Sequence, residues 1–258
     1  MRDPHVESLR YLLRPSEDVT FDQPPPIEWD TDDFHMRLEN GVAIFEMRRH
    51  YPSKEAAQQA VEAYLRTWEI DAALGSNRAE IHFDFDSAEI IDRDPPPPGT
   101  TQVICAGSIV ATGKLSMVVT RARYPDIPSN FVLSPDVESI WNRYQGYLDG
   151  RELLTTMGYF CLTVVEASTG KKSGRRSAAS KDYSIEDGVL NKLGYLSSEV
   201  GNVGTARKMP RVPRDHTPQE TAWIEAAVKK LIRRMGEYAY DQNFDWPQIT
   251  MKNLPELP

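Results

Sequence analysis

The sequence contains little cysteine and no long apolar run. Only two of its 258 residues are cysteines, and both Cys105 and Cys161 lie in apolar stretches, as buried and reduced thiols do. The longest uncharged apolar stretches, around 103–110 and 158–165, are far shorter than the ~20 residues that span a bilayer. The charged residues near the start of the sequence also do not fit the pattern of a secretory leader. These absences predict a cytoplasmic protein with no membrane partner.

Most familiar catalytic and cofactor signatures are missing as well. The chain has no G-x-S-x-G nucleophile elbow, no H-E-x-x-H zinc helix, no C-x-x-C pair and no G-x-G-x-x-G dinucleotide loop. Each of these motifs places a nucleophile, a metal ligand or a phosphate-binding backbone at a fixed spacing. We therefore expect no cofactor and no dedicated metal site.

One acidic run nevertheless carries residues of the metal-ligand type. Glu80, His82, Asp84 and Asp86 alternate along a predicted strand and share one face. Oxygen ligands in this pattern suit a hard cation such as Mg²⁺. However, carboxylates about 7 Å apart along a strand need further ligands from elsewhere to complete one site. The sequence therefore favours a solvated, charged sheet face over a cation site.

The charge is distributed unevenly along the chain. The net charge of −8 resolves into 13 Lys+Arg against 22 Asp+Glu up to residue 133, and 17 against 16 afterwards. Such a difference between halves predicts two units with different partners.

The first half has the pattern of a sheet with one helix. Phe34–Leu38 and Val42–Arg49 flank Asn40–Gly41, the strongest short hairpin signal. Ser53 is a helix N-cap, and apolar residues follow it at helical spacing. The other predicted segments are a short helix at Val6–Leu13, a loop at Phe21–Asp33, a strand at Ala79–Asp86, and two β-rich runs, Gln102–Ala111 and Leu115–Arg123, joined by a turn at Thr112–Lys114. The expected order is close to ββαβββ, which favours a mostly antiparallel sheet.

The second half changes to helical periodicity. Ser134–Pro135 and Thr217–Pro218 are N-caps followed by proline at the first helical position, and Glu220 completes a capping box with Thr217. Between them lie a strongly apolar helix around residues 153–165, a basic loop at Gly170–Ser180 and a helix starting near Ser184. Four amphipathic helices are enough for an antiparallel bundle.

The expected fold class is therefore α+β. A mostly antiparallel N-terminal sheet with a covering helix precedes a C-terminal four-helix bundle. The predicted domains are an acidic α+β domain at 1–130 and a helical bundle at 134–242, followed by an extended tail at 243–258.

A short motif leads into the last helix. Arg211 and His216 have four residues between them, and the helical half resembles the HEPN domains, small α-bundles in which an Arg–x(4–6)–His motif cleaves RNA without metal, usually across a dimer. The resemblance implies that His216 moves the 2′-hydroxyl proton and that Arg211 stabilises phosphorane charge. Val212 stands where the family usually has a polar residue, and Pro213 imposes an extended backbone on the motif.

Basic residues gather in two loops of the second half. Basic loops flanked by serine and glycine are candidate RNA-binding surfaces, because they can contact phosphates. The candidate nucleic-acid-binding residues are Lys171, Lys172, Arg175, Arg176, Arg207, Lys208 and Arg214. A third basic group, from Lys229 to Arg234, is predicted to lie on the outer face of the last helix.

Two functions compete on this sequence. The first is a binding or assembly protein without catalytic chemistry, in which a HEPN-like bundle is fused to an acidic α+β domain and associates with a protein partner or with itself. The alternative is a metal-independent ribonuclease of the HEPN type that uses Arg211 and His216. The absence of other catalytic signatures favours the first.

Overall fold

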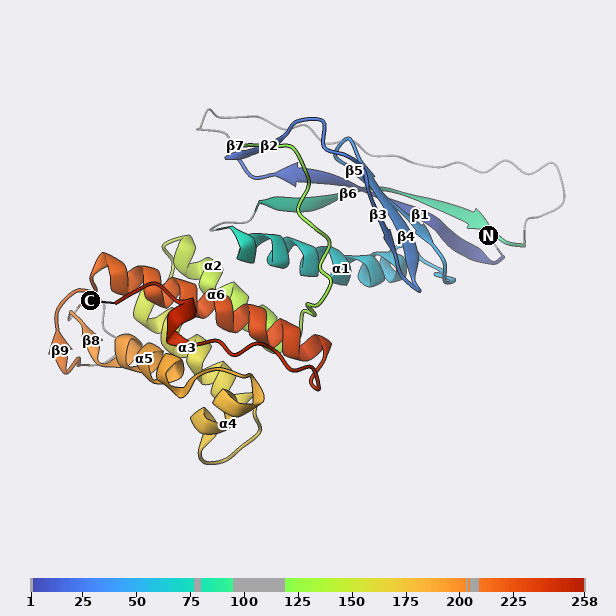
Figure 1. The fold of residues 1–258 in the computed structure, drawn as a ribbon. Helices are drawn as coiled ribbons and strands as arrows, with labels where there is room; N and C mark the ends of the chain where they lie inside the picture. Colours follow the sequence, from blue (N-terminus) through green and yellow to red (C-terminus); the bar gives the residue numbers. More distant parts are fainter. Residues whose placement is uncertain (1, 77–79, 95–118, 203, 205–208, 258) are drawn as a thin grey trace. The chain divides into compact units, whose positions relative to one another are not determined.

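The computed structural model describes residues 2–76, 80–94, 119–202, 204 and 209–257. The protein is α+β and divides into two compact units, Met1–Pro128 and Ser129–Pro258 (Figure 1). Within the described ranges, no helix combines the length and the apolar character needed to cross a membrane. Each unit is described by itself below.

The first unit is an antiparallel sheet with one long helix. Five strands in the order β3-β4-β5-β1-β6 form the sheet. A parallel pair, β2 with β7, forms a separate two-stranded sheet. The elements are β1 (Pro4–Pro15), β2 (Val19–Phe21), β3 (Ile27–Asp30), β4 (Phe34–Glu39), β5 (Val42–Met47), α1 (Lys54–Gly75), β6 (Ile81–Asp92) and β7 (Val119–Arg121).

The predicted hairpin around Asn40–Gly41 is confirmed. Asn40 and Gly41 take positive φ angles of 51° and 75°, as the tight turn between two twisted strands requires. Leu38 pairs with Ala43 and Glu39 with Val42 across the turn. The Gly41 N–H donates to the hydroxyl of Tyr124 at 2.8 Å, so a distant residue fixes the turn.

The predicted helix at Val6–Leu13 is wrong, because this segment lies within strand β1. Its apolar residues fit both a helical and a strand period, and pairing to β5 on one side and β6 on the other selects the strand. Leu9, Tyr11 and Leu13 then alternate into the core. Strand β3 likewise occupies part of the predicted loop Phe21–Asp33. The predicted turn at Thr112–Lys114 lies outside the described residues.

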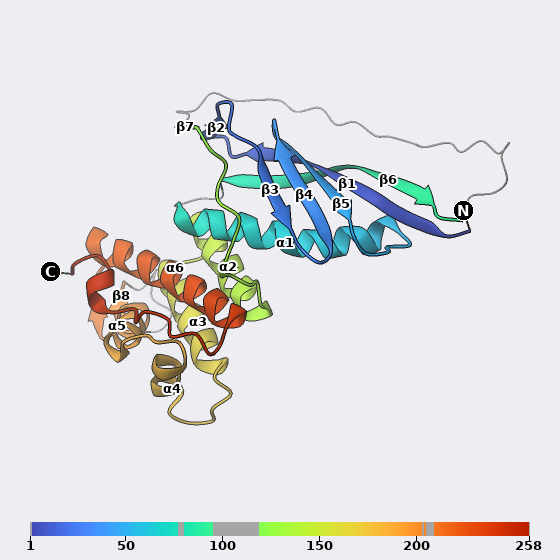
Figure 2. The ribbon, with the colours of Figure 1, turned by 45° about the vertical axis from the view of Figure 1, so that its right-hand side comes forward.

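Helix α1 covers one face of this sheet (Figures 1 and 2). Its predicted N-cap is confirmed, since the Ser53 hydroxyl accepts from the Ala56 N–H at 3.3 Å. Trp68 is fully buried and packs against Phe83 and Trp29 at ring-centroid distances of 5.2 and 6.1 Å. The buried aromatic side chains between helix and sheet make this the core of the unit.

A buried histidine predicts that this unit loses stability in acid. His5 is 2% exposed and stacks on His50 at 5.4 Å. Burial first, and then repulsion from Arg93, lowers the pKa of His5 below its ordinary value of 6.5. Below about pH 6.5 the unfolded chain therefore binds this proton more readily than the folded chain does, and stability falls with falling pH.

We expect the urea midpoint of unfolding to drop between about pH 7.5 and about pH 5.5 in the wild type, and to drop less in His5→Leu. His50→Gln removes the more exposed ring of the pair and with it a smaller repulsion on His5, so it should reduce the slope less than His5→Leu does. An identical pH slope in His5→Leu would contradict the assignment.

The second unit is built from helices. Its elements are α2 (Pro135–Leu148), α3 (Leu154–Ala167), α4 (Arg175–Asp182), α5 (Asp187–Ser198), β8 (Val200–Gly201), β9 (Val212–Pro213), α6 (Pro218–Tyr240) and the 3₁₀ turn η1 (Met251–Asn253). The predicted caps are confirmed: Ser134 accepts from Val137 N–H, and Thr217 and Glu220 form the capping box of α6. Helix α3 packs against α2, α5 and α6, which places it centrally as its apolar sequence predicts.

Three local predictions for this unit need correction. The loop predicted at Gly170–Ser180 contains the short helix α4, so the described part of the bundle has this helix in addition to the four predicted. The tail predicted as extended contains η1 and is held by hydrogen bonds, among them Ile249 N–H to the Ser184 carbonyl at 2.9 Å. Arg234, predicted on the outer face of α6, is 4% exposed.

Candidate functional site

The segment carrying Arg211 and His216 is fastened to the C-terminal end of α5. The Arg211 guanidinium pairs with Glu199, the C-cap residue of α5, at 3.1 Å. The Val212 N–H donates to the Glu199 carbonyl at 2.8 Å. The His216 Nε2–H donates to the Leu196 carbonyl at 2.9 Å. Both residues of the motif thus bind the last turn of one helix.

The two side chains have separate partners at the end of α5. In the part of the chain that the structure describes, no hydrogen bond or ion pair joins Arg211 to His216. The bond to Leu196 commits Nε2 as a donor, so only Nδ1 could accept a proton. Arg211 is largely exposed, with 85% of its side chain accessible.

Arg214, a predicted phosphate contact, is already engaged. Its guanidinium donates to both carboxylate oxygens of Glu220 at 2.7 and 2.8 Å, a bidentate geometry that adds strength to an ion pair. These bonds, together with the Thr217 N–H, lower the pKa of Glu220 to about 2. Arg214 therefore stabilises the start of α6, while Arg207 and Lys208 of the same predicted group lie outside the described residues.

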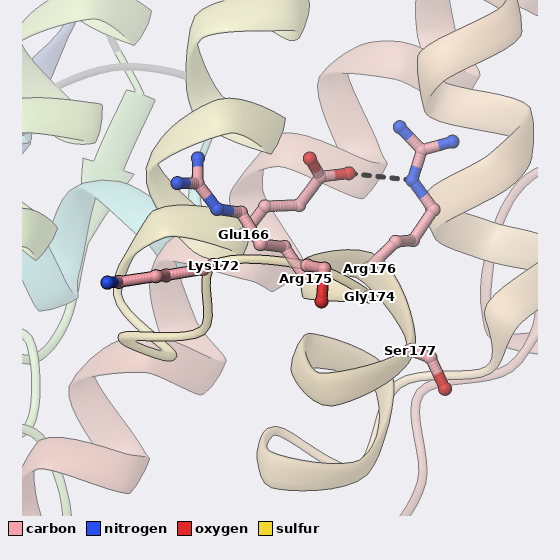
Figure 3. Close-up of a pocket in the computed structure, with 7 residues that line it drawn as sticks. Glu166, Lys172, Gly174, Arg175, Arg176 and Ser177 are labelled. Carbon is pink, nitrogen blue, oxygen red and sulfur yellow. Dashed lines mark hydrogen bonds and ion pairs between the residues drawn. The ribbon is translucent and has the colours of Figure 1, made fainter.

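The other basic loop, residues 171–176, connects α3 to α4 and includes the first residues of α4 (Figure 3). Gly170 and Gly174 take φ angles of 67° and 64°, a region that favours glycine. They turn the chain from α3 into α4. Arg175 Nε donates to the Lys171 carbonyl at 2.8 Å, and Arg176 Nε donates to Glu166 at 2.6 Å. The sequence spacing alone predicted this basic loop, but not its anchoring to α3.

A hollow of about 600 Å³ lies on this loop. Its lining residues are Glu166, Lys172, Ser173, Gly174, Arg175, Arg176 and Ser177. Figure 3 shows Lys172 and Arg175 extending toward the same side, while Arg176 turns to Glu166. The first N–H groups of α4 add the positive end of a helix dipole. The chemistry of the hollow therefore suits an anionic group.

The alternating acidic face at Glu80–Asp86 is an ion-paired surface. Glu80 pairs with Arg121 at 2.6 Å. Asp84 pairs with Arg14 at 3.0 Å and Asp86 with Arg10 at 2.9 Å. Among the described residues, no three His, Cys, Asp or Glu side chains are placed to hold a metal ion. The arginines supply the positive charge that a cation would otherwise provide.

Sequence reasoning missed a second hollow, of about 590 Å³, on the first unit. Its lining residues are Glu7, Ser8, His35, Glu46, Met47, Arg48 and Glu89. Ser8 of β1 lies opposite Glu46 of β5 on one side and Glu89 of β6 on the other. The alternation of apolar and polar residues along each strand indicates which side chains share this face. The row across three strands, however, depends on the strand order.

Comparison with known proteins gave no match: no protein-family model, no curated protein and no solved structure matches this chain.

Proposed function

We propose that this chain is a binding and assembly protein without catalytic chemistry of its own, in which a HEPN-like helical bundle presents the basic loop 171–176 to an anionic surface. The observation that carries the proposal is the separate use of Arg211 and His216. Each residue fastens the segment before α6 to α5, through Glu199 and Leu196, and this is a structural task.

The exposed cations support the binding part of the proposal. Lys172 and Arg175 line one hollow beside the N-terminus of α4. Neither has a carboxylate partner among the residues that the structure describes. Solvated cations of this kind attract anionic surfaces over roughly 8–10 Å at ordinary ionic strength.

An RNA assay separates this proposal from the ribonuclease alternative. Labelled single-stranded RNA is incubated with the intact protein and chelator near neutral pH, and both cleavage and fluorescence anisotropy are measured. We expect no cleavage by the wild type, His216→Ala or Arg211→Ala. Cleavage by the wild type that disappears in both variants would overturn the proposal and establish the ribonuclease.

The same RNA serves as a polyanion probe of the loop. We expect Lys172→Ala/Arg175→Ala to weaken binding at low salt by about 5-fold or more, since each lost phosphate contact removes counterion release. Arg151→Ala/Lys252→Ala removes the same charge from exposed positions elsewhere in the unit and should weaken binding less. Equal weakening of RNA binding in both double variants would show that the loop has no specific role in binding.

A further inference from the structure

Most carboxylates on the sheet face opposite α1 are neutralised by arginines of the same face. The pairs are Arg37 with Glu28 and Glu39, Arg48 with Asp30, Arg10 with Asp86, and Arg14 with Asp84. Glu46 and Glu89 differ, because no cationic partner contacts either within the described ranges. In the described part of the chain, the one ion-pair contact of Glu7 is with His5, at 3.7 Å, and burial lowers the pKa of that ring.

Strand register brings these three carboxylates to one place. Glu46 and Glu89 both lie opposite Ser8, so they sit on strands two apart, about 10 Å from each other. Together with Glu7 they line the hollow of about 590 Å³. The exposed Ile44, at 41%, adds apolar surface on the same strand as Glu46. The result is a hollow lined by three carboxylates without an arginine partner among the described residues, beside Arg48, which pairs with Asp30 instead.

The second unit carries the complement of this hollow. Lys171, Lys172 and Arg175 are exposed, and none contacts a carboxylate among the described residues. Three unmatched cations on a projecting loop thus correspond to three unmatched carboxylates in a hollow. Long lysine and arginine stems can also lie along apolar surface such as Ile44.

We infer that the acidic hollow of one copy binds the basic loop 171–176 of a second copy. Because every chain carries both halves of the contact, a two-fold dimer forms it twice, and each chain both gives and receives a loop. The inference rests on the proposed binding function and names the partner of its loop. Its electrostatic origin makes the association strongest at low salt.

Charge exchange tests the contact with the full-length chain. The acid-swapped variant is Glu46→Lys/Glu89→Lys, and the loop-swapped variant is Lys172→Glu/Arg175→Glu. Mass is measured by light scattering from about 1 to about 100 µM protein, at about 0.05 M and about 0.5 M salt. We expect the wild type to approach twice 29.3 kDa at low salt and to dissociate at high salt. Each swapped variant alone should dissociate at least about 10-fold more readily, and the equimolar mixture should restore the dimer.

Two features keep this test specific. All four changed residues are exposed, and circular dichroism checks that the variants stay folded. Glu55→Lys/Glu62→Lys changes the same charge on the exposed surface of α1 and should leave the association unchanged.

A wild type that stays monomeric throughout would overturn the inference. So would a dimer that the swaps do not weaken, a mixture that fails to associate, or an α1 control that dissociates as readily as the swapped variants. Failure of the proposed function has a different signature, namely metal-independent RNA cleavage that is lost in His216→Ala and Arg211→Ala. The cleavage assay does not depend on the measured mass of the protein.

Discussion

Replacing Arg234 with methionine should lower the free energy of unfolding of the helical unit by about 3–5 kcal/mol, because the change strands buried polar groups. Arg234 donates from one terminal nitrogen to the Tyr183 and Ser184 carbonyls at 2.6 and 3.1 Å. The other terminal nitrogen donates to the Pro247 carbonyl at 2.6 Å. Methionine can replace the apolar stem but none of these donors.

The loss should be concentrated where those carbonyls lie. Arg234 joins α6 to the connection between α4 and α5 and to the segment before η1. We therefore expect faster hydrogen exchange at the Ile249 N–H, which bonds to Ser184, along with a lower midpoint in urea followed by tryptophan fluorescence.

The neighbouring arginine provides a matched control. The Arg233 side chain is 45% exposed, and Arg233→Met should cost less than about 1 kcal/mol. If both substitutions had the same small effect, the buried arginine would not be the anchor of the C-terminal segment.

Local signals predicted most of the helix and turn positions correctly. Ser53, Ser134 and Thr217 accept the backbone hydrogen bonds expected of N-caps, and Asn40–Gly41 forms the expected turn. Each of these signals works within four residues and needs no knowledge of the tertiary fold.

The failures occur where distant residues decide the structure. The segment Val6–Leu13 is a strand because β5 and β6 flank it. The hydrophobic period of the segment itself gives no sign of these two neighbouring strands. Helix α4 lacks a side-chain cap at Gly174 and buries only Ala179, so it carries almost no helical pattern. Charge usually indicates exposure and so predicts Arg234 on the outer face, whereas hydrogen bonds to backbone carbonyls hold it in the interior.

The candidate sites divide in the same way. The spacing of Arg211 and His216 was visible, but their partners Glu199 and Leu196 lie 12 and 20 residues away in the chain. Glu46, Ser8 and Glu89 form a row only because the strand order is β5-β1-β6. Charge along the sequence indicates which unit is acidic, whereas the ion pairs and the strand register of the structure indicate which acids lack a cationic partner among the described residues.

The second large effect is expected at Gly236, which lies in the last turns of α6. In an exposed helix, Gly→Ala stabilises by roughly 0.5–1 kcal/mol. Here a Cβ atom at Gly236 would lie 2.1 Å from a ring carbon of Phe131, far inside contact distance. Phe131 is 4% exposed, and Arg233 lies over its ring at 5.5 Å, so the ring has little room to move.

We expect Gly236→Ala to destabilise the helical unit by about 2–3 kcal/mol, opposite in sign to the propensity effect. Urea unfolding measures the change. Gly75→Ala, in α1 of the first unit, is the control for the propensity effect, since nothing lies within 4 Å of its Cβ position and the substitution should be neutral or slightly stabilising for that unit. Phe131→Ala removes the clashing ring at its own cost. The double variant Phe131→Ala/Gly236→Ala should therefore be more stable than the sum of the single effects predicts, by about 1–2 kcal/mol. Strict additivity would mean that the Phe131 ring and the helix backbone at Gly236 do not press on each other.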